Sequence, residues 1–155
     1  MLFITHLRNR KGFTLVELLI GTAVFAVLAE LAVQSFIGQL PDYWLNGATR
    51  QVAFDLMGAR VQAIHQNQNV IVSFTSNHEY AIGADLNNNG VLDNGEGTTT
   101  DVQQRDPALS FTGALPAPLI FNSQGLANSS PVITIANSSG SKRITVTLVG
   151  NVGVD

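Results

Sequence analysis

The chain has 155 residues, of which 45% are hydrophobic and only 12% are charged, and its formal net charge is −3. This length favours a single domain with a modest core. Because it has no cysteine, the chain excludes a disulfide scaffold, a thiolate zinc site and a cysteine nucleophile. Three of the eight basic residues lie in the first 11 positions, so the rest carries 5 basic against 11 acidic side chains. An acidic body repels phosphate, which disfavours direct nucleic-acid binding.

The first predicted element is a membrane-spanning helix over residues 13–37. Among charged residues this apolar run contains only Glu17 and Glu30. As a helix rising about 1.5 Å per residue it spans roughly 37 Å, enough to cross a hydrocarbon core about 30 Å thick. The preceding segment, residues 1–12, is basic and ends at Gly12. A basic segment before an apolar span predicts a cytoplasmic N-terminus, with the rest of the chain across the membrane.

A secretory signal peptide is the alternative interpretation of this start, because it also joins a basic segment to an apolar one. Residues 13–37 are longer than a signal-peptide core, and no small-x-small cleavage site follows them closely. The small residue in a cleavage-like setting is Gly12, and a cut there would leave the apolar helix on the mature protein. The sequence therefore favours a retained anchor.

Residues 11–20 read Lys-Gly-Phe-Thr-Leu-Val-Glu-Leu-Leu-Ile and resemble the class III signal motif of type IV pilins and type II secretion pseudopilins. The resemblance implies that a prepilin peptidase cuts between Gly12 and Phe13, that the new amine of Phe13 is methylated, and that Glu17 serves assembly. It also implies an assembly platform protein and other pilins or pseudopilins as partners. The implied location is the bacterial inner membrane, with a single span and a periplasmic C-terminal domain, before incorporation into a filament.

Glu17 is a candidate site on physical grounds as well. A carboxylate inside a bilayer is costly and needs a partner. In the mature chain the nearest cation is the α-amine of Phe13, one helical turn away, in the same subunit or in a neighbour. Pairing between subunits would fix their axial register. Glu30, about 20 Å further along the helix, is expected at the outer membrane interface, with a second intersubunit contact as the alternative.

The rest of the chain predicts the second half of one long helix and then strands. After residues 38–42, which contain Pro41 and could bend the helix, a helical apolar stripe runs from Tyr43 to about Asn67. The stripe consists of Leu45, Ala48, Val52, Leu56, Ala59 and Ala63, and we expect Trp44, Phe54, Met57, Val61 and Ile64 to widen it. Strands are predicted at residues 70–75, 79–84, 108–111, 118–121, 132–136, 143–149 and 152–154.

The predicted fold class is α+β, with a long N-terminal helix packed on an antiparallel β-sheet or small β-sandwich, as in pilins. The predicted domain plan is a cleaved leader at 1–12, a membrane helix at 13–37 and a periplasmic globular domain at 38–155. Residues 59–64, 120–125 and 147–152 extend the resemblance to the GspH/FimT group of minor pilins. Within them, Arg60 is expected to be a solvated helix residue.

One loop carries a candidate metal site. Residues 85–96 fit the calcium-loop pattern D-x-[DN]-x-[DN]-G-x5-E at every position. Side-chain oxygens and one backbone carbonyl would come from Asp85, Asn87, Asn89, Val91, Asp93 and Glu96. No predicted helix flanks the loop, and Asn-Gly is also a turn signal, so an unliganded hairpin connection is the alternative. Apart from calcium, no cofactor is predicted.

No enzymatic motif is apparent, because G-x-S-x-G, H-E-x-x-H and the Walker pattern do not occur. We therefore predict a filament subunit without enzymatic activity, a minor pilin or pseudopilin of a type IV pilus or type II secretion system. The alternative function is a membrane-anchored periplasmic domain that binds calcium or acts as an enzyme.

Overall fold

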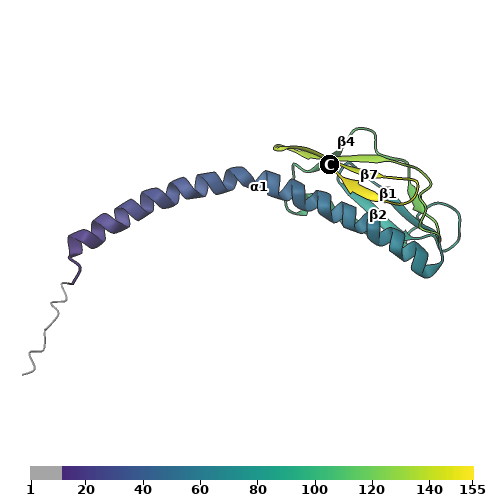
Figure 1. Ribbon diagram of the computed structural model, residues 1–155, viewed down its shortest axis with the longest axis horizontal. Coiled ribbons are helices and arrows are strands. Elements are labelled where there is room, and N and C mark those ends of the chain that lie inside the picture. The colour runs from purple at the N-terminus through teal and green to yellow at the C-terminus, as the bar shows by residue number, and fades with distance from the viewer. Residues whose placement is uncertain (1–11) are drawn as a thin grey trace, which may run out of the picture. The chain divides into compact units, whose positions relative to one another are not determined.

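The computed structural model describes residues 12–155, apart from the side chains of Gln34 and Ser35. The described chain forms one long helix, a short 3-10 helix and two β-sheets (Figure 1). The predicted leader lies outside the described residues except for Gly12. The chain divides into two compact units, residues 1–39 and 40–155.

Helix α1 runs from Leu15 to Gln66 without a break. Pro41 lies inside it, so residues 38–42 continue the helix, as the prediction of one long helix requires. Proline lacks an N–H and deprives an earlier carbonyl of its helical donor. The carbonyl oxygen of Pro41 itself accepts a hydrogen bond from Nδ2 of Asn137 at 2.7 Å. This hydrogen bond connects the helical turn that contains Pro41 to Asn137 in the strand region of the second unit.

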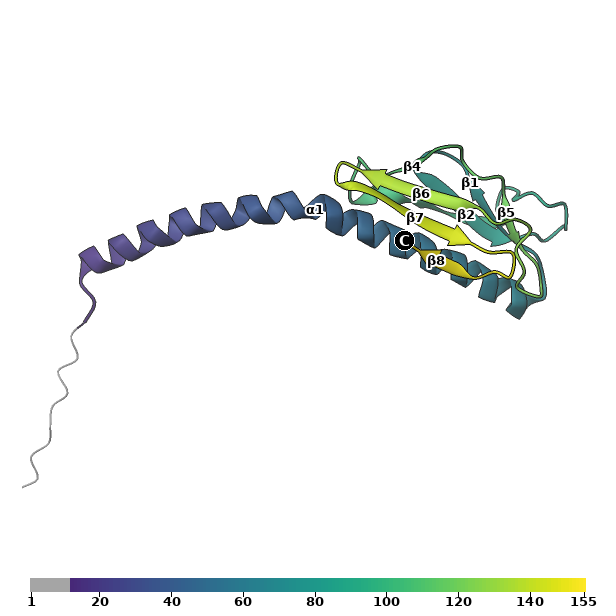
Figure 2. The ribbon, with the colours of Figure 1, turned by 45° about the horizontal axis from the view of Figure 1, so that its top comes forward.

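Two antiparallel sheets follow the helix. The first has the order β3-β2-β1-β5 and consists of β1 (Val70–Phe74), β2 (Glu79–Ala84), β3 (Gly97–Asp101) and β5 (Leu119–Phe121). The second has the order β4-β6-β7-β8 and consists of β4 (Ser110–Thr112), β6 (Val132–Asn137), β7 (Gly140–Val146) and β8 (Val152–Val154). The 3-10 helix η1 (Val102–Gln104) follows β3. Figure 2 shows the strands along one side of the second half of α1. The predicted α+β fold is confirmed.

A single apolar core joins residues 40–66 of α1 to both sheets. The helix contributes mainly Leu45, Val52, Ala53, Leu56, Ala59 and Ala63, and the strands contribute Val70, Val72, Tyr80, Phe111, Leu119, Phe121, Ile133, Ile135, Ile144 and Val146. The predicted helical stripe is therefore the core-facing side of α1. The expected widening of that stripe is wrong for four residues, because Phe54, Met57, Val61 and Ile64 are exposed on another side of the helix.

Tyr80 joins the first sheet to the helix. Its side chain is fully buried and its hydroxyl donates a hydrogen bond to the carboxylate of Asp55. Burial and, after it, this hydrogen bond to a carboxylate raise the pKa of Tyr80 well above its usual range. The phenol therefore stays neutral and acts as a donor across the interface between β2 and α1.

Strand β3 is not predicted from the sequence. Its residues, Gly-Thr-Thr-Thr-Asp, show no apolar alternation because this edge strand is exposed or half-buried throughout. Backbone pairing with β2 forms it, with Glu79 opposite Asp101 and Gly83 opposite Gly97. A Cβ on Gly83 would overlap the carbonyl oxygen of Glu96, so the two backbones approach closely only because this position is glycine.

Candidate functional site

The N-terminal end of α1 contains the predicted processing and assembly residues. Gly12 and Phe13 precede the helix and are exposed. The carboxylate of Glu17 accepts hydrogen bonds from the backbone N–H of Thr14 at 3.0 Å and from its hydroxyl at 2.9 Å. In return, the N–H of Glu17 donates to the Thr14 hydroxyl at 3.2 Å. These contacts form a capping box, in which two otherwise unpaired helix donors are satisfied.

The capping box gives Glu17 a partner inside its own chain, which the sequence analysis missed. From the sequence, the amine of Phe13 is the expected partner of Glu17. The pattern T-x-x-E directly before an apolar run is a recognised signal for a helix start, so residues 14–17 contained the information. Glu17 therefore has a hydrogen-bonded state that does not require a neighbouring subunit.

The first half of α1 presents an apolar surface on every side. All large apolar side chains between residues 13 and 37 are exposed, from Phe13 at 86% to Val24 at 55%. By length and composition, α1 can cross a membrane, and among the described residues it is the one such helix. Exposure of a surface this apolar to water is unfavourable, so the surface requires a cover of lipid or of another protein.

A second apolar surface lies on α1 within the globular unit. Its large side chains, exposed by 41% to 70%, are Phe54, Met57, Val61 and Ile64. We call these four residues the outer face of α1. Their spacing of three or four residues places them along one side of the helix, and the core stripe occupies another. Residues 40–66 are therefore apolar on two sides, of which the chain itself covers one.

Arg60 is not the solvated residue that the sequence analysis expected. It is half-buried, and its Nε donates a hydrogen bond to the carbonyl oxygen of Gly125 at 3.0 Å. Its Nη1 lies 3.5 Å from Oδ1 of Asn151. Both partners belong to the C-terminal segments that resemble the GspH/FimT group, so Arg60 connects the three matching segments in space.

Two glycines make room for this arginine. Gly125 and Gly150 have positive φ angles of 75° and 78°, a conformation that other L-residues rarely adopt. A Cβ on Gly125 would lie 2.7 Å from Cδ1 of Ile64, and one on Gly150 would lie 2.7 Å from Nε of Arg60. The glycines are thus required both by the backbone conformation and by the space that Arg60 occupies.

The predicted calcium loop connects β2 to β3 and begins with a buried carboxylate. Asp85 is 2% exposed. Its Oδ1 accepts a hydrogen bond from the N–H of Asn89 at 3.0 Å and its Oδ2 accepts one from the N–H of Gly90 at 2.9 Å. Gly90 has a φ of 76°, which supports the sharp turn expected there. The loop therefore wraps around Asp85.

The other side chains of this loop are also paired within it. Oδ2 of Asp93 accepts hydrogen bonds from the amide nitrogens of Asn87 and Asn89 at 2.8 Å and 2.9 Å. The carboxylate of Glu96 accepts from the N–H groups of Leu86 and Asp93. Among the described residues, Asp85, Asp93 and Glu96 do not gather their oxygens into one metal-sized group. The loop is a closed hairpin connection in which backbone and amide donors occupy the carboxylates.

A hollow of about 280 Å³ separates the start of the globular unit from η1. It is lined by residues of α1, among them Tyr43, Trp44 and Gln51, and by Asp101 and Arg105 near η1. Its lining includes no serine, histidine or lysine.

Comparison with known families matches two parts of the chain. Residues 48–150 match the family described as type II transport protein GspH, and residues 7–29 match the prokaryotic N-terminal methylation motif. The first match covers α1 from residue 48 onward and every strand except β8, and it includes Arg60, Gly125 and Gly150. The second covers Gly12, Phe13 and Glu17. No curated protein matches the chain closely enough to count as a relative.

Solved structures with a similar fold include two filament subunits. The type IV minor pilin FimU of Pseudomonas aeruginosa superposes with a TM-score of 0.57 at 16% identity, covering 72% of this chain and 87% of the other. The minor pseudopilin EpsH of the Vibrio cholerae type 2 secretion system gives 0.55 at 16% identity, covering 72% and 95%. At this identity the likeness concerns the fold, a long helix packed on antiparallel strands.

Proposed function

This chain belongs to the GspH family of type II transport proteins, and on that premise we propose that it enters a filament through helix α1. The family and the methylation motif make it a minor pilin or pseudopilin. It is thus a structural subunit of a type IV pilus or a type II secretion pseudopilus. The anchored calcium-binding or enzymatic domain considered as an alternative is not favoured by these findings.

The observation that carries the proposal is that the methylation motif continues into an apolar helix. Residues 13–37 expose every large apolar side chain, and the motif spans residues 7–29 of the same segment. Lipid covers such a surface while the subunit is anchored. In a filament, the apolar helices of neighbouring subunits replace the lipid. The same surface therefore anchors the subunit in the membrane and later packs against other subunits.

Processing is proposed at the bond between Gly12 and Phe13. A prepilin peptidase removes residues 1–12 and methylates the amine of Phe13. The cut separates three basic residues from the chain and creates a new amine on Phe13. Glu17, four positions further on, becomes the fifth residue of the mature protein. The basic leader supports a cytoplasmic N-terminus, with one span in the inner membrane and the globular unit in the periplasm.

Glu17 is proposed to exchange one partner for another during assembly. In the isolated chain its carboxylate is hydrogen-bonded to Thr14. A carboxylate retains lone pairs after two such bonds, so it can accept the amine of a neighbouring Phe13 without leaving the capping box. The pair would form in a low-dielectric bundle, where an unpaired charge is costly, and would therefore select one axial register.

The outer face of α1 extends the proposed contact beyond the membrane segment. Phe54 is 70% exposed and Val61 is 55% exposed, although both lie on a helix of a folded globular unit. Exposed apolar side chains at helical spacing are typical of surfaces that other proteins cover. In the filament, the helices of neighbouring pilins would pack here, and an assembly platform protein would act before that stage.

The decisive experiment compares two glutamates of the same apolar helix. Glu17→Ala should be inserted and cleaved normally but should enter filaments poorly, because the neighbour's amine loses its partner. Glu30→Ala removes the other carboxylate of the segment and should enter filaments normally. Thr14→Ala removes the cap while keeping the carboxylate, and it should also be incorporated. Equal incorporation of Glu17→Ala and wild type in sheared filaments would refute the pairing.

Calcium binding by residues 85–96 is a separate proposal. The full pattern match and the buried Asp85 support it, because the six positions supply the oxygen ligands that calcium prefers. The internal hydrogen bonds support the unliganded hairpin instead. The two states differ in the orientation of two side-chain amides. In the structure, the amide nitrogens of Asn87 and Asn89 donate to Asp93. Calcium binding requires their amide oxygens to face the ion instead. A thermal-unfolding measurement that separates them is described in the Discussion.

A further inference from the structure

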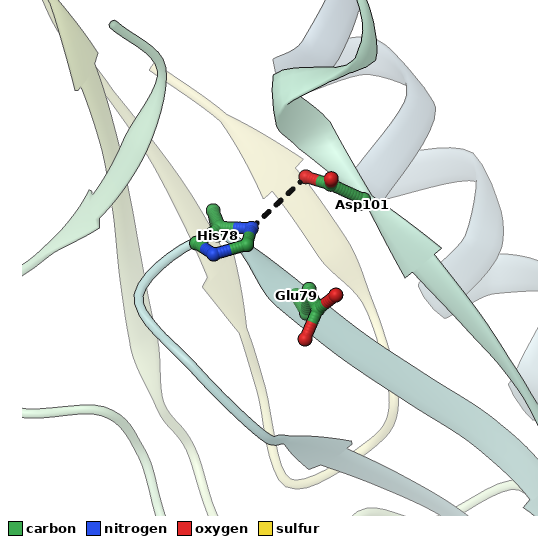
Figure 3. A group of neighbouring side chains, drawn as sticks. All are labelled: His78, Glu79 and Asp101. Atoms are coloured by element: carbon green, nitrogen blue, oxygen red, sulfur yellow. Dashed lines mark hydrogen bonds and ion pairs between the residues drawn. The ribbon is translucent and has the colours of Figure 1, made fainter. Parts of the chain in front are cut away.

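A cluster of three possible metal ligands lies on the first sheet (Figure 3), and one of them, Asp101, also lines the hollow near η1. His78 precedes β2, Glu79 begins it, and Asp101 ends β3. Because Glu79 and Asp101 are direct partners in the antiparallel ladder, their side chains leave the same face of the sheet. One ligand atom from each of the three residues lies within 4.8 Å of the other two.

The charges of this cluster are not balanced by the chain. Like charges directly opposite each other on neighbouring strands repel. Within the group, Nδ1 of His78 lies 3.1 Å from Oδ1 of Asp101, a hydrogen bond that is an ion pair only when the imidazole is protonated. No described residue donates a hydrogen bond to the carboxylate of Glu79 or forms an ion pair with it. A bridging cation would neutralise both carboxylates at once.

The spacing of these atoms suits a metal ion. Two ligands with bonds of about 2.1 Å and a separation of 3.1 Å subtend about 95° at the metal. His78 and Asp101 are 31% and 35% exposed, so water can reach the site and fill the remaining positions. The N–H of Gln103 donates to Oδ1 of Asp101 at 2.7 Å, which orients this carboxylate as outer-shell donors do in metal sites.

We propose that His78, Glu79 and Asp101 bind a divalent cation of the Zn²⁺ class, with water completing its coordination. One imidazole nitrogen and two carboxylates form a donor set that suits zinc, whereas calcium and magnesium take oxygen ligands. The ion replaces the hydrogen bond between His78 and Asp101 and links the β1–β2 turn to the end of β3. This site goes beyond the proposed filament function and does not depend on it.

The test is a titration of the full chain in detergent micelles, stripped with a chelator, with zinc chloride and separately with cobalt chloride. Calorimetry should show saturable zinc binding, and the melting temperature should rise because the ion binds the folded state. Cobalt should give a visible absorption spectrum of a bound ion. His78→Ala, Glu79→Gln and Asp101→Asn should each weaken binding by about 10-fold or more, since losing a ligand costs at least as much as losing an outer-shell partner.

His65→Ala is the matched control, because His65 is an exposed histidine at the end of α1. It should bind zinc as wild type does, and so should Glu96→Gln in the calcium-loop segment. Absence of a zinc response in the wild type, or an undiminished response in Glu79→Gln, overturns the proposal. If His78→Ala unfolds, the isosteric Glu79→Gln and Asp101→Asn variants decide the question by the same measurements.

Discussion

Arg60 donates a hydrogen bond from Nε to the carbonyl oxygen of Gly125 at 3.0 Å, across 65 positions of sequence. The arginine lies near the C-terminal end of α1, whereas Gly125 lies after β5 in the first sheet. On the other side, Gly150 after β7 approaches the same side chain. One helical residue thus connects α1 to a loop of each sheet.

Replacing Arg60 with alanine should lower the free energy of unfolding by about 1.5–3 kcal/mol, the usual range for a hydrogen bond from a charged donor. The carbonyl of Gly125 loses its donor, and the space between the two glycine loops is left partly empty. Chemical denaturation of the full chain in detergent measures this change.

Arg50→Ala is the control for the Arg60 prediction. Arg50 is an exposed arginine on the same helix, so its removal should change the free energy of unfolding by less than about 0.5 kcal/mol. Equal effects of the two substitutions would mean that the contact between Arg60 and Gly125 does not stabilise the fold.

Alanine at Gly125 or Gly150 should destabilise the chain more than alanine at Gly113. All three glycines have positive φ angles, so each substitution incurs about 1–2 kcal/mol of backbone strain. Only at Gly125 and Gly150 does the new Cβ also meet neighbouring atoms, while at Gly113 nothing lies within 4 Å. Melting temperatures of the three variants test this order, and a Gly113→Ala variant as unstable as the others would contradict it.

The sequence predicts the long helix and most strands because apolar spacing marks the sides that face the core. It does not predict β3, an edge strand whose residues are exposed or half-buried throughout, nor the roles of Arg60 and Tyr80, which depend on contacts between distant segments. The sequence predicts that the outer face of α1 belongs to the core, because Phe54 and Val61 resemble core residues by type. Composition alone cannot distinguish a side that the chain buries from one left for another subunit.

Tyr80→Phe tests the buried hydroxyl and its pH dependence. Burial and the hydrogen bond to Asp55 raise the pKa of Tyr80 in the folded state, so the associated stability is present below the unfolded value of about 10. It is lost as pH rises above that value, because only the unfolded chain releases the proton. The free energy of unfolding of the wild type should therefore begin to fall near about pH 10 and continue to fall toward the raised pKa of the folded state.

The phenylalanine variant should be less stable than wild type by about 1 kcal/mol at pH 7, and its stability should decline less steeply at alkaline pH. Tyr43, which is 68% exposed, is present in both proteins, so it does not contribute to the difference between their pH profiles. Parallel pH profiles for wild type and variant would contradict a raised pKa at Tyr80.

Calcium should raise the melting temperature of the full chain in detergent if residues 85–96 bind it, because a ligand of the folded state stabilises by mass action. Glu96→Gln should remove most of this rise, since a bidentate carboxylate becomes a weaker oxygen ligand, and magnesium should have a smaller effect than calcium. A melting curve that responds neither to millimolar calcium nor to a chelator identifies the loop as a plain hairpin connection.

The central claim is that this chain is a processed filament subunit, and the mass of its N-terminal peptide in sheared filaments tests it most directly. We predict that the chain recovered from filaments begins at Phe13 and carries one methyl group on its amine. A chain that begins after residue 30 would lack most of the apolar helix and would identify residues 1–30 as a secretory signal peptide. That result, or the absence of the chain from the filament fraction, would contradict the account.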